Sequence, residues 1–437
     1  MKRLLLILCS LSLMLCITAQ NPRKDIQKNL RLSGGSFLAY PGPSHHKQTS
    51  APNGKKPFYI SHFGRHGSRY PTKKDDFWYV IKTLQESEEE HALTPLGKDV
   101  LHRVILMEQE AHQRAGELTS LGATQHQEIA ERMMRRFPQV FDGNVTIEAK
   151  STTSVRCILS MVNALMKMQT MNPKMVLKYD ASQHDMDYLR HDDSLLTNQS
   201  LDKRNTSIYH AFLDAHPTWE RVVDQLYADT EYKNQHVDGK KLNTYLFRLA
   251  SALQNMDLRK KITLYDLFTD DEIYENWRKD NVCWYLGFGF APSNGGKMPF
   301  SQRFLLRRII EEADSCLNLD HPGATLRYGH DTALLPLVCL MGINDYDLQT
   351  SDLEKMERSG WADYKIIPMA ANLQLVFYRN GRHDQDVLVK VLLNENEATL
   401  PLKTDVAPYY HWQDFRDFYL QRINAYDEER AQEEDVD

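Results

Sequence analysis

The feature that most constrains this chain is a short, mostly apolar run that leads directly into a basic turn. Residues 58–63 are rich in aromatic side chains and predict a short buried strand. The turn that follows, residues 64–69, reads Gly-Arg-His-Gly-Ser-Arg. Its two glycines let the backbone approach a ligand closely and adopt positive φ. The sequence therefore predicts a strand that ends at a ligand-binding turn.

The side chains of this turn suit a phosphate group. Arg65 and Arg69 can bind a dianionic phosphate through the planar donors of their guanidinium groups. His66 stands between them, and a ring nitrogen of a neutral imidazole can attack phosphorus. The alternative is a basic surface loop after a strand, because short motifs also arise by chance.

A second strand-to-helix junction also carries ionisable side chains. Residues 324–328 predict a strand, which ends in Gly-His-Asp-Thr at residues 329–332, and helix-compatible apolar sequence follows. In α/β sheets ligands bind at the carboxyl ends of strands, so this junction and the one at His66 could meet in one pocket. The alternative is that His330 packs beneath the helix while Asp331 caps it.

Arg156 is a third candidate cation for the same pocket. Residues 145–149 alternate as a strand does, and a long apolar helix begins at Val155 after a polar turn. Arg156 lies in the first turn of that helix, where the helix dipole disfavours a cation, so a bound anion would help to explain it. An ordinary surface arginine is the alternative.

These segments resemble the histidine acid phosphatases, the second branch of the histidine phosphatase superfamily. Residues 65–72, Arg-His-Gly-Ser-Arg-Tyr-Pro-Thr, resemble the family signature, and residues 329–332 resemble its proton-donor motif. The segment around Arg156 resembles the one that supplies a third phosphate-binding arginine, and residues 118–122 resemble a Leu-Thr-x-x-Gly element. The chain is most similar to phytases and multiple inositol polyphosphate phosphatases, although the latter usually carry His-Ala-Glu where this chain has His-Asp-Thr.

The resemblance implies a role for each candidate residue. His66 is the expected nucleophile, Asp331 the expected proton donor, and His330 a further catalytic residue. The implied phosphate-binding residues are Arg65, Arg69, Arg156 and His330, and the implied substrate-binding residues are Thr72 and Lys73. A carboxylic acid holds a proton only at low pH or with a raised pKa, so we expect an acidic optimum.

No metal and no cofactor are expected. The arginines would supply the positive charge that a magnesium ion supplies in other phosphate sites. The spacing of three further histidines, His184, His191 and His210, fits no standard metal site. Four cysteines follow the N-terminal segment described below, and their three possible pairings stay open; they are Cys157, Cys283, Cys316 and Cys339.

The order of the predicted elements indicates an α/β fold with a mainly parallel central sheet flanked by helices. Two apolar runs, residues 372–378 and 387–393, flank Asn380-Gly381 and predict a hairpin of antiparallel strands at one sheet edge. The predicted helices include residues 75–90, 98–115, 124–137, 303–317 and 412–426. The acidic tail, residues 427–437, is expected to be disordered.

Residues 20–170 and 300–437 are expected to form the α/β phosphatase core. Residues 171–299 carry no functional motif but contain several helical patterns, so we expect a smaller, mostly helical insertion or cap domain. In the family that the chain resembles, a variable helical domain of this kind covers the pocket and helps to set substrate choice.

The first 19 residues have the pattern of a secretory signal peptide. A short basic start precedes an apolar run over residues 4–17, and a cleavage point follows Ala19. That run is too short to span a bilayer comfortably, and no later run is apolar enough to do so. We therefore expect a periplasmic or secreted protein. A formal net charge of −6 argues against nucleic acid as the main partner.

The sequence as a whole predicts an exported acid phosphomonoesterase that acts through a phosphohistidine, with inositol polyphosphates such as phytate as the expected substrates. A phosphatase for sugar phosphates or general monoesters stays open. A mutase of the phosphoglycerate type is disfavoured by the export signal and by Asp331. A non-catalytic phosphate-binding protein would keep the arginines but would need neither His66 nor Asp331.

Overall fold

The structure of the chain is a computed structural model that describes residues 21–45, 47–73, 75–190, 193–194, 196 and 207–434. The predicted signal peptide, residues 1–19, lies outside these ranges. None of the described helices is both long and apolar enough to cross a membrane.

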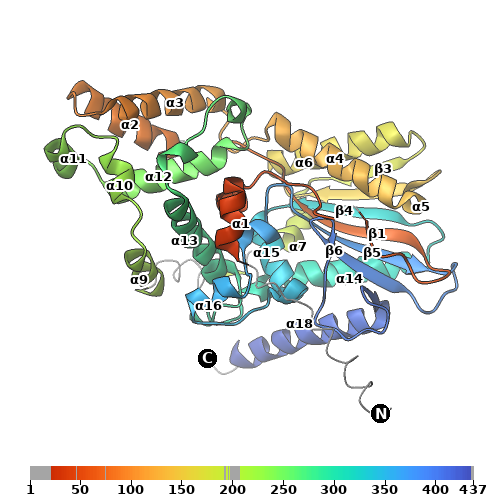
Figure 1. The fold of residues 1–437 in the computed structure, drawn as a ribbon. Coiled ribbons are helices and arrows are strands. Elements are labelled where there is room, and N and C mark those ends of the chain that lie inside the picture. Colours follow the sequence, from red (N-terminus) through yellow and green to blue (C-terminus); the bar gives the residue numbers. More distant parts are fainter. Residues whose placement is uncertain are drawn as a thin grey trace, which may run out of the picture.

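The described residues form one mixed, eight-stranded sheet (Figure 1). Its strands are β1 (Lys56–Arg65), β2 (Thr146–Ser151), β3 (Val176–Asp180), β4 (Gly323–Gly329), β5 (Asn372–Arg379), β6 (Leu388–Leu393), β7 (Asn396–Glu397) and β8 (Tyr409–His411). The order is β3-β2-β4-β1-β5-β6-β7, with β8 beside β6. Strands β3, β2, β4 and β1 are parallel, and β5 begins an antiparallel half. The predicted α/β class and the predicted hairpin are confirmed.

Helices cover both faces of this sheet (Figure 1). One face packs on α4 (Ser120–Arg136), α5 (Pro138–Phe141) and α6 (Val155–Met171), and the other on α14 (Arg303–Leu317), α15 (Asp331–Leu340) and α18 (Trp412–Glu434). Successive strand side chains point to opposite faces. In β1, accordingly, Ile60 belongs to the apolar cluster of the first face, whereas Tyr59 and Phe63 belong to that of the second.

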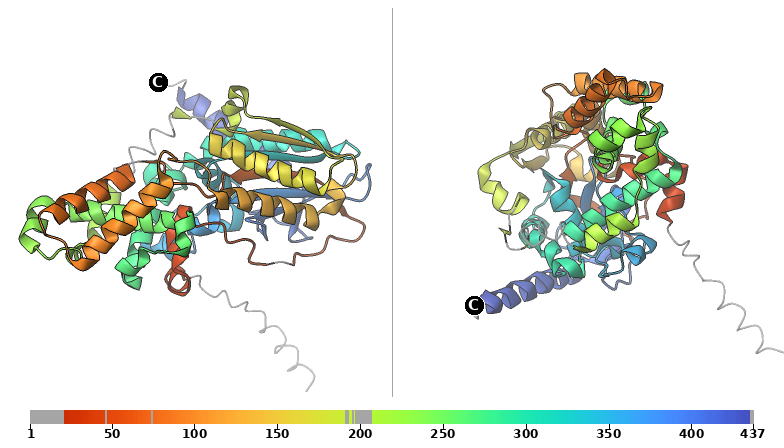
Figure 2. Two further views of the ribbon diagram at one scale, coloured as in Figure 1. Left: turned by 90° about the horizontal axis from the view of Figure 1, so that it is seen from above. Right: turned by 90° about the vertical axis from the view of Figure 1, so that its left-hand side faces the viewer.

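A separate apolar cluster holds together a helical region that lies to one side of the sheet (Figures 1 and 2). It joins α2 (Asp75–Glu89), α3 (Pro95–Ala111), α10 (Glu220–Asp224), α12 (Gly239–Leu253) and the first half of α13 (Asp270–Phe288). The second half of α13 packs into the sheet cluster, so this helix links the two regions. The division into a core and an insertion at residues 171–299 stays a prediction.

Shorter helices fill the remaining described sequence. They are α1 (Pro22–Lys28), η1 (Leu30–Phe37), η2 (Gln183–Asp185), α7 (Met186–Leu189), α9 (Ser207–Ala215), α11 (Thr230–His236), η3 (Asp257–Lys260), η4 (Tyr265–Leu267), η5 (Pro292–Asn294), η6 (Met298–Gln302), η7 (Ile343–Asp345), α16 (Leu353–Arg358) and α17 (Asp363–Ile366). Among them, η1 and the residue that follows α17 each supply a carbonyl group to the candidate site described below.

The acidic tail corrects one expectation. Of the predicted disordered tail, residues 427–434 continue α18 to Glu434, and residues 435–437 lie outside the described ranges. Asp427 is ion-paired with Arg303 at 2.7 Å and with Arg307 at 3.1 Å, both on α14. Lys297 lies within 3.1 Å of a carboxylate oxygen of Glu429 and within 3.0 Å of one of Glu433. A run of like charges predicts disorder when it is considered alone, and here basic side chains from distant sequence neutralise it.

The cysteines left open by the sequence form no disulfide among the described residues. Cys157 and Cys339 are buried, as is common for thiols that pack as small apolar side chains. Burial raises the pKa of the Cys157 thiol to about 11, so this group stays protonated.

Candidate active site

The topology of the sheet brings the two predicted junctions together. Strands β1 and β4 are parallel neighbours, and Arg65 pairs with Gly329 at their carboxyl ends. The backbone N–H of His66 donates to the carbonyl of Gly329 at 2.9 Å. The rings of His66 and His330 therefore lie side by side, with centroids 5.7 Å apart.

The segment just before β5 holds the same turn from the other side of β1. The Arg65 N–H donates to the carbonyl of Ala371 at 2.7 Å, and the Ala370 N–H donates to the carbonyl of His66 at 2.9 Å. The backbone around the histidine is thus bonded to β4 on one side and to the segment that leads into β5 on the other.

Two glycines explain how the turn packs on the start of α4. A Cβ on Gly67 would lie 2.5 Å from the Gly122 carbonyl oxygen, and a Cβ on Gly122 would lie 2.2 Å from that of Ser68. Thr119 caps α4 by accepting from the Gly122 N–H at 3.2 Å, and its own N–H donates to Ser68 at 2.9 Å. The Leu-Thr-x-x-Gly element is therefore the platform on which the basic turn rests.

His66 is held as a neutral imidazole with a defined tautomer. Its Nδ1 lies 2.9 Å from the carbonyl oxygen of Gly67. A carbonyl accepts and cannot donate, so Nδ1 carries the proton and Nε2 keeps its lone pair. Burial lowers the pKa of His66 well below its usual value, and the neighbouring cations Arg65, Arg69 and Arg156 lower it further. This is the state that nucleophilic attack requires.

Arg65 is fully buried and fixed by several partners. Its guanidinium donates to the carbonyl of Ser36 in η1 at 2.6 Å and to that of Ile367 just after α17. It also forms an ion pair with Asp331 at 2.5 Å. The structure thus ties the first basic residue of the turn to the acidic residue of the second junction.

Arg69 and Arg156 complete a group of three guanidiniums. Arg69 donates to the carbonyl of Tyr70 at 3.1 Å, and Arg156 lies 3.4 Å from Nδ1 of His330. The buried Nε atoms of Arg65, Arg69 and Arg156 lack a hydrogen-bond partner in the part of the chain that the structure describes. Donors with unused capacity fit the binding of a tetrahedral anion.

His330 is nearly buried and has partners at both ring nitrogens. Its Nε2 lies 3.2 Å from the hydroxyl of Thr152 and 3.4 Å from that of Ser154. An arginine can only donate, so Nδ1, which faces Arg156, is the acceptor and Nε2 carries the proton. Burial lowers the pKa of His330 to about 4, against the opposing effect of Asp331. The ring is therefore neutral above this pH.

Asp331 lies in the first turn of α15, and His330, not Asp331, occupies the N-cap position. The Asp331 carboxylate accepts from the Thr332 N–H at 2.8 Å. Burial raises its pKa, but Arg65, Arg69 and His330 together lower it more, so the pKa lies below its usual value. In this state the carboxyl group is ionised, whereas a proton donor must hold a proton.

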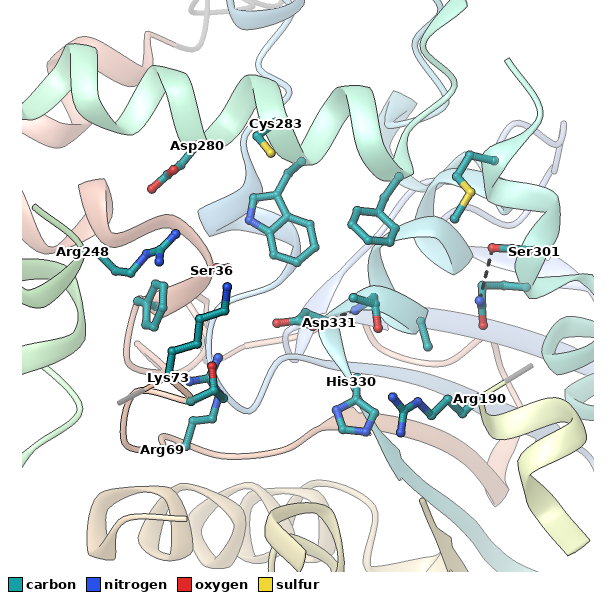
Figure 3. Close-up of a pocket in the computed structure, with 18 of the residues that line it drawn as sticks. Ser36, Arg69, Lys73, Arg190, Arg248, Asp280, Cys283, Ser301, His330 and Asp331 are labelled. Atoms are coloured by element: carbon teal, nitrogen blue, oxygen red, sulfur yellow. Dashed lines mark hydrogen bonds between the residues drawn. The ribbon is translucent and has the colours of Figure 1, made fainter. Parts of the chain in front are cut away.

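A cavity of about 770 Å³ lies beside these residues (Figure 3). Five of the predicted residues line it: Arg69, Thr72, Lys73, His330 and Asp331. Arg65, His66 and Arg156 do not line the cavity themselves, but each lies against a residue that does. Arg65 is ion-paired with Asp331, the ring of His66 lies beside that of His330, and Arg156 lies 3.4 Å from Nδ1 of His330. Arg190, Arg248 and Asp280 also line it, and sequence reasoning missed them because they belong to segments without a motif.

Of the three histidines that were considered as metal ligands, His184 lies in η2 and His210 in α9, and His191 is outside the described residues.

Known proteins are similar to this chain in sequence and in fold. The chain is 24% identical over 375 residues to multiple inositol polyphosphate phosphatase 1 of Gallus gallus, which covers 79% of each protein. Its fold is similar to that of the multiple inositol polyphosphate phosphatase of Bifidobacterium longum, solved with inositol hexasulfate. That similarity has a TM-score of 0.72 and 16% identity, and it covers 87% of this chain and 96% of the other.

A phytase from D. castellii is also similar in fold. The TM-score is 0.64 at 17% identity, covering 90% of this chain and 85% of the phytase. Residues 63–394 match the family model of the histidine phosphatase superfamily (branch 2), a span that contains both junctions and Arg156. By this match, the chain belongs to the histidine phosphatase superfamily, branch 2.

Proposed function

We propose that this protein is an exported acid phosphomonoesterase that dephosphorylates inositol polyphosphates through a phosphohistidine. The observation that supports this most is the state of His66: a buried, neutral imidazole with Nε2 unprotonated, beside three guanidiniums and one carboxylate. A binding protein would need the cations but would have no use for such a nucleophile.

The chemistry follows from these residues. Arg65, Arg69 and Arg156 bind the non-bridging phosphoryl oxygens and stabilise the charge that develops on them. Nε2 of His66 attacks phosphorus in line, an N–P bond forms, and the P–O bond to the alcohol breaks. Asp331 gives its proton to the departing alkoxide. The resulting carboxylate then takes a proton from water, which attacks the phosphohistidine and releases inorganic phosphate.

Substrate binding raises the pKa of Asp331, and the carboxyl group can then hold the proton that it donates. In the structure its carboxylate is paired with Arg65, and the pKa is lowered. A bound phosphate dianion places negative charge beside Asp331 and competes for the Arg65 donors, and both effects raise the carboxyl pKa. A low pH helps in the same direction, so activity should be highest under acidic conditions.

Two observations support inositol polyphosphates as the substrate class. The relatives named above include inositol polyphosphate phosphatases and a phytase. Around the cavity, Lys73 and Arg190 add cations beyond those at the reacting phosphate, and we propose that Lys73 and Thr72 contact the substrate. The alternative, a phosphatase for sugar phosphates or general monoesters, uses the same reacting residues.

A substrate panel at acidic pH tests the proposal. Purified protein is assayed with phytate, glucose 1-phosphate and p-nitrophenyl phosphate, and the inositol phosphate isomers formed are resolved by chromatography. Preferential turnover of phytate supports the proposal, whereas preferential turnover of glucose 1-phosphate favours the alternative. Export is tested separately, by sequencing the N-terminus of the protein recovered outside the cytoplasm, where cleavage after Ala19 is expected.

A further inference from the structure

The cavity has two unlike sides. Lys73, after the basic turn, and Arg190, after α7, contribute cations, and neither forms an ion pair with a described residue. Figure 3 shows Arg190 beside His330 and Lys73 extending across the cavity from the side of Arg69. This side can accept phosphate groups other than the one that reacts.

The opposite side is formed by α13, which presents a carboxylate and two aromatic rings. Asp280 and the half-buried rings of Trp284 and Phe288 line the cavity from this helix, and the two ring centroids lie 5.1 Å apart. Figure 3 shows Asp280 above the guanidinium of Arg248. This side therefore presents a carboxylate beside aromatic faces.

The cation on the α13 side is already matched by carboxylates. Arg248 of α12 is ion-paired at 3.0 Å with Asp76 of α2, whose side chain is only 5% exposed. Asp280 adds a second carboxylate to the same surroundings, and Lys279 of the same helix adds a second cation, so the four groups carry no net charge. A phosphate placed here finds no excess of positive charge, in contrast to the side of Lys73.

Resting on the proposed function, we propose that Asp280 and Trp284 make the α13 side a subsite for free hydroxyl groups and the ring face. A carboxylate accepts hydrogen bonds from hydroxyls, and an aromatic ring packs against the C–H face of a cyclitol. The cavity thereby selects inositol phosphates that carry hydroxyl groups on that side over fully phosphorylated inositol. Such substrates are products of an earlier dephosphorylation.

The test compares Asp280→Asn with the wild type. The measured quantity is the ratio of kcat/KM for inositol hexakisphosphate to kcat/KM for an inositol trisphosphate. The substitution removes the charge and keeps the size, so we expect this ratio to rise about fivefold. Turnover of p-nitrophenyl phosphate, which lacks further phosphates, should change less than about twofold and reports that the site is intact.

The matched control is Asp270→Asn, which makes the same change of charge at an exposed position in the first turn of α13. It should leave the ratio unchanged. A ratio in Asp280→Asn equal to that of the control and the wild type would overturn the proposal. If Asp280→Asn does not fold, Asp280→Ser removes the same charge. A wild type that hydrolyses none of the three esters would overturn the proposed function together with this inference.

The size of the effect should also depend on pH. Desolvation in the cavity wall raises the pKa of Asp280, against the effects of Arg248 on α12 and Lys279 on α13. The charged groups around it include these two cations, the carboxyl of Asp363 on α17 and, through Arg248, the carboxylate of Asp76. Because its pKa is raised, Asp280 takes up its proton at a higher pH than an ordinary aspartate, so the effect of its substitution on the ratio should shrink as the pH falls. An effect that grows toward acid pH would argue against charge as the cause.

Discussion

Arg65, at the end of β1, forms an ion pair of 2.5 Å with Asp331, in the first turn of α15. The pair joins the two strand ends that carry the candidate chemistry. Arg65 has two opposing effects on Asp331: it positions the carboxylate, and it lowers the pKa and so disfavours the protonated form that a proton donor needs.

Replacing Asp331 by Asn should lower kcat by about 10²–10³-fold for alkyl phosphates such as inositol phosphates, because a departing alkoxide needs a proton. The loss should be much smaller for p-nitrophenyl phosphate, because nitrophenolate leaves without one. Steady-state kinetics on both substrates test this. Equal losses on the two substrates would contradict a proton-donor role and indicate a role in positioning Arg65.

Replacing His66 by Ala should reduce turnover of every phosphate ester by at least about 10³-fold, because no other side chain replaces the nucleophile. Wild-type protein mixed with radiolabelled substrate and quenched in alkaline denaturant should retain a phosphate label that acid then releases, and the variant should not. His112→Ala, at an exposed histidine on the end of the α3 region, is the control and should behave as the wild type. Labelling that persists in His66→Ala would place the phosphoenzyme elsewhere.

Because of His126, the free energy of unfolding should fall as the pH is lowered. It is buried on α4 near Tyr328, with ring centroids 5.5 Å apart, and burial lowers its pKa to about 3. In the unfolded chain a histidine titrates near pH 6.5, so between these values the unfolded state binds one proton more. The free energy of unfolding should therefore fall by about 1.4 kcal/mol per pH unit as pH drops through this window, from this group alone.

Urea unfolding between pH 7 and pH 4 measures that slope. The variant His126→Gln shares every other titrating group with the wild type, so the difference between the two slopes belongs to His126. The exposed His112→Gln serves as the control and should keep the wild-type slope. An unchanged slope in His126→Gln would mean that His126 binds the same number of protons in the folded and the unfolded state.

Gly122→Ala should disrupt the platform beneath the basic turn. The added methyl would lie 2.2 Å from the Ser68 carbonyl oxygen, which is backbone and cannot rotate away. We expect a loss of about 2 kcal/mol or more in stability, with a fall in kcat because the turn must shift. Thermal unfolding and phosphatase assays check both effects, and Ser120→Ala, in the same helical turn, is the near-neutral control. A fully active, stable Gly122→Ala would show that the turn can move freely.

The part of the site that the sequence could predict is the part that is local in the chain. Arg65, His66 and Arg69 lie within five residues, and the second junction carries its own pattern, so strand-end geometry was enough to bring them together. Arg156 was assigned to the same pocket by the resemblance to the family, and in the structure it lies 3.4 Å from Nδ1 of His330.

What the sequence could not predict depends on long-range packing. Arg190, Arg248 and Asp280 reach the cavity from segments with no motif, and their roles follow from which helices meet there. The lowered pKa of Asp331 likewise comes from its pairing with Arg65, 266 positions away in the chain. The helical tail depends on Lys297, just before η6, and on cations of α14.

Strand β1 is bonded to a parallel neighbour on one side and to an antiparallel neighbour on the other, and β4 and the segment that leads into β5 both bond to the backbone around His66. The backbone that carries His66 is consequently fixed from two sides, and adaptation to new substrates falls to side chains on α12 and α13. Substitutions on α12 and α13 can therefore change which leaving group the cavity accepts while the backbone around His66 stays the same.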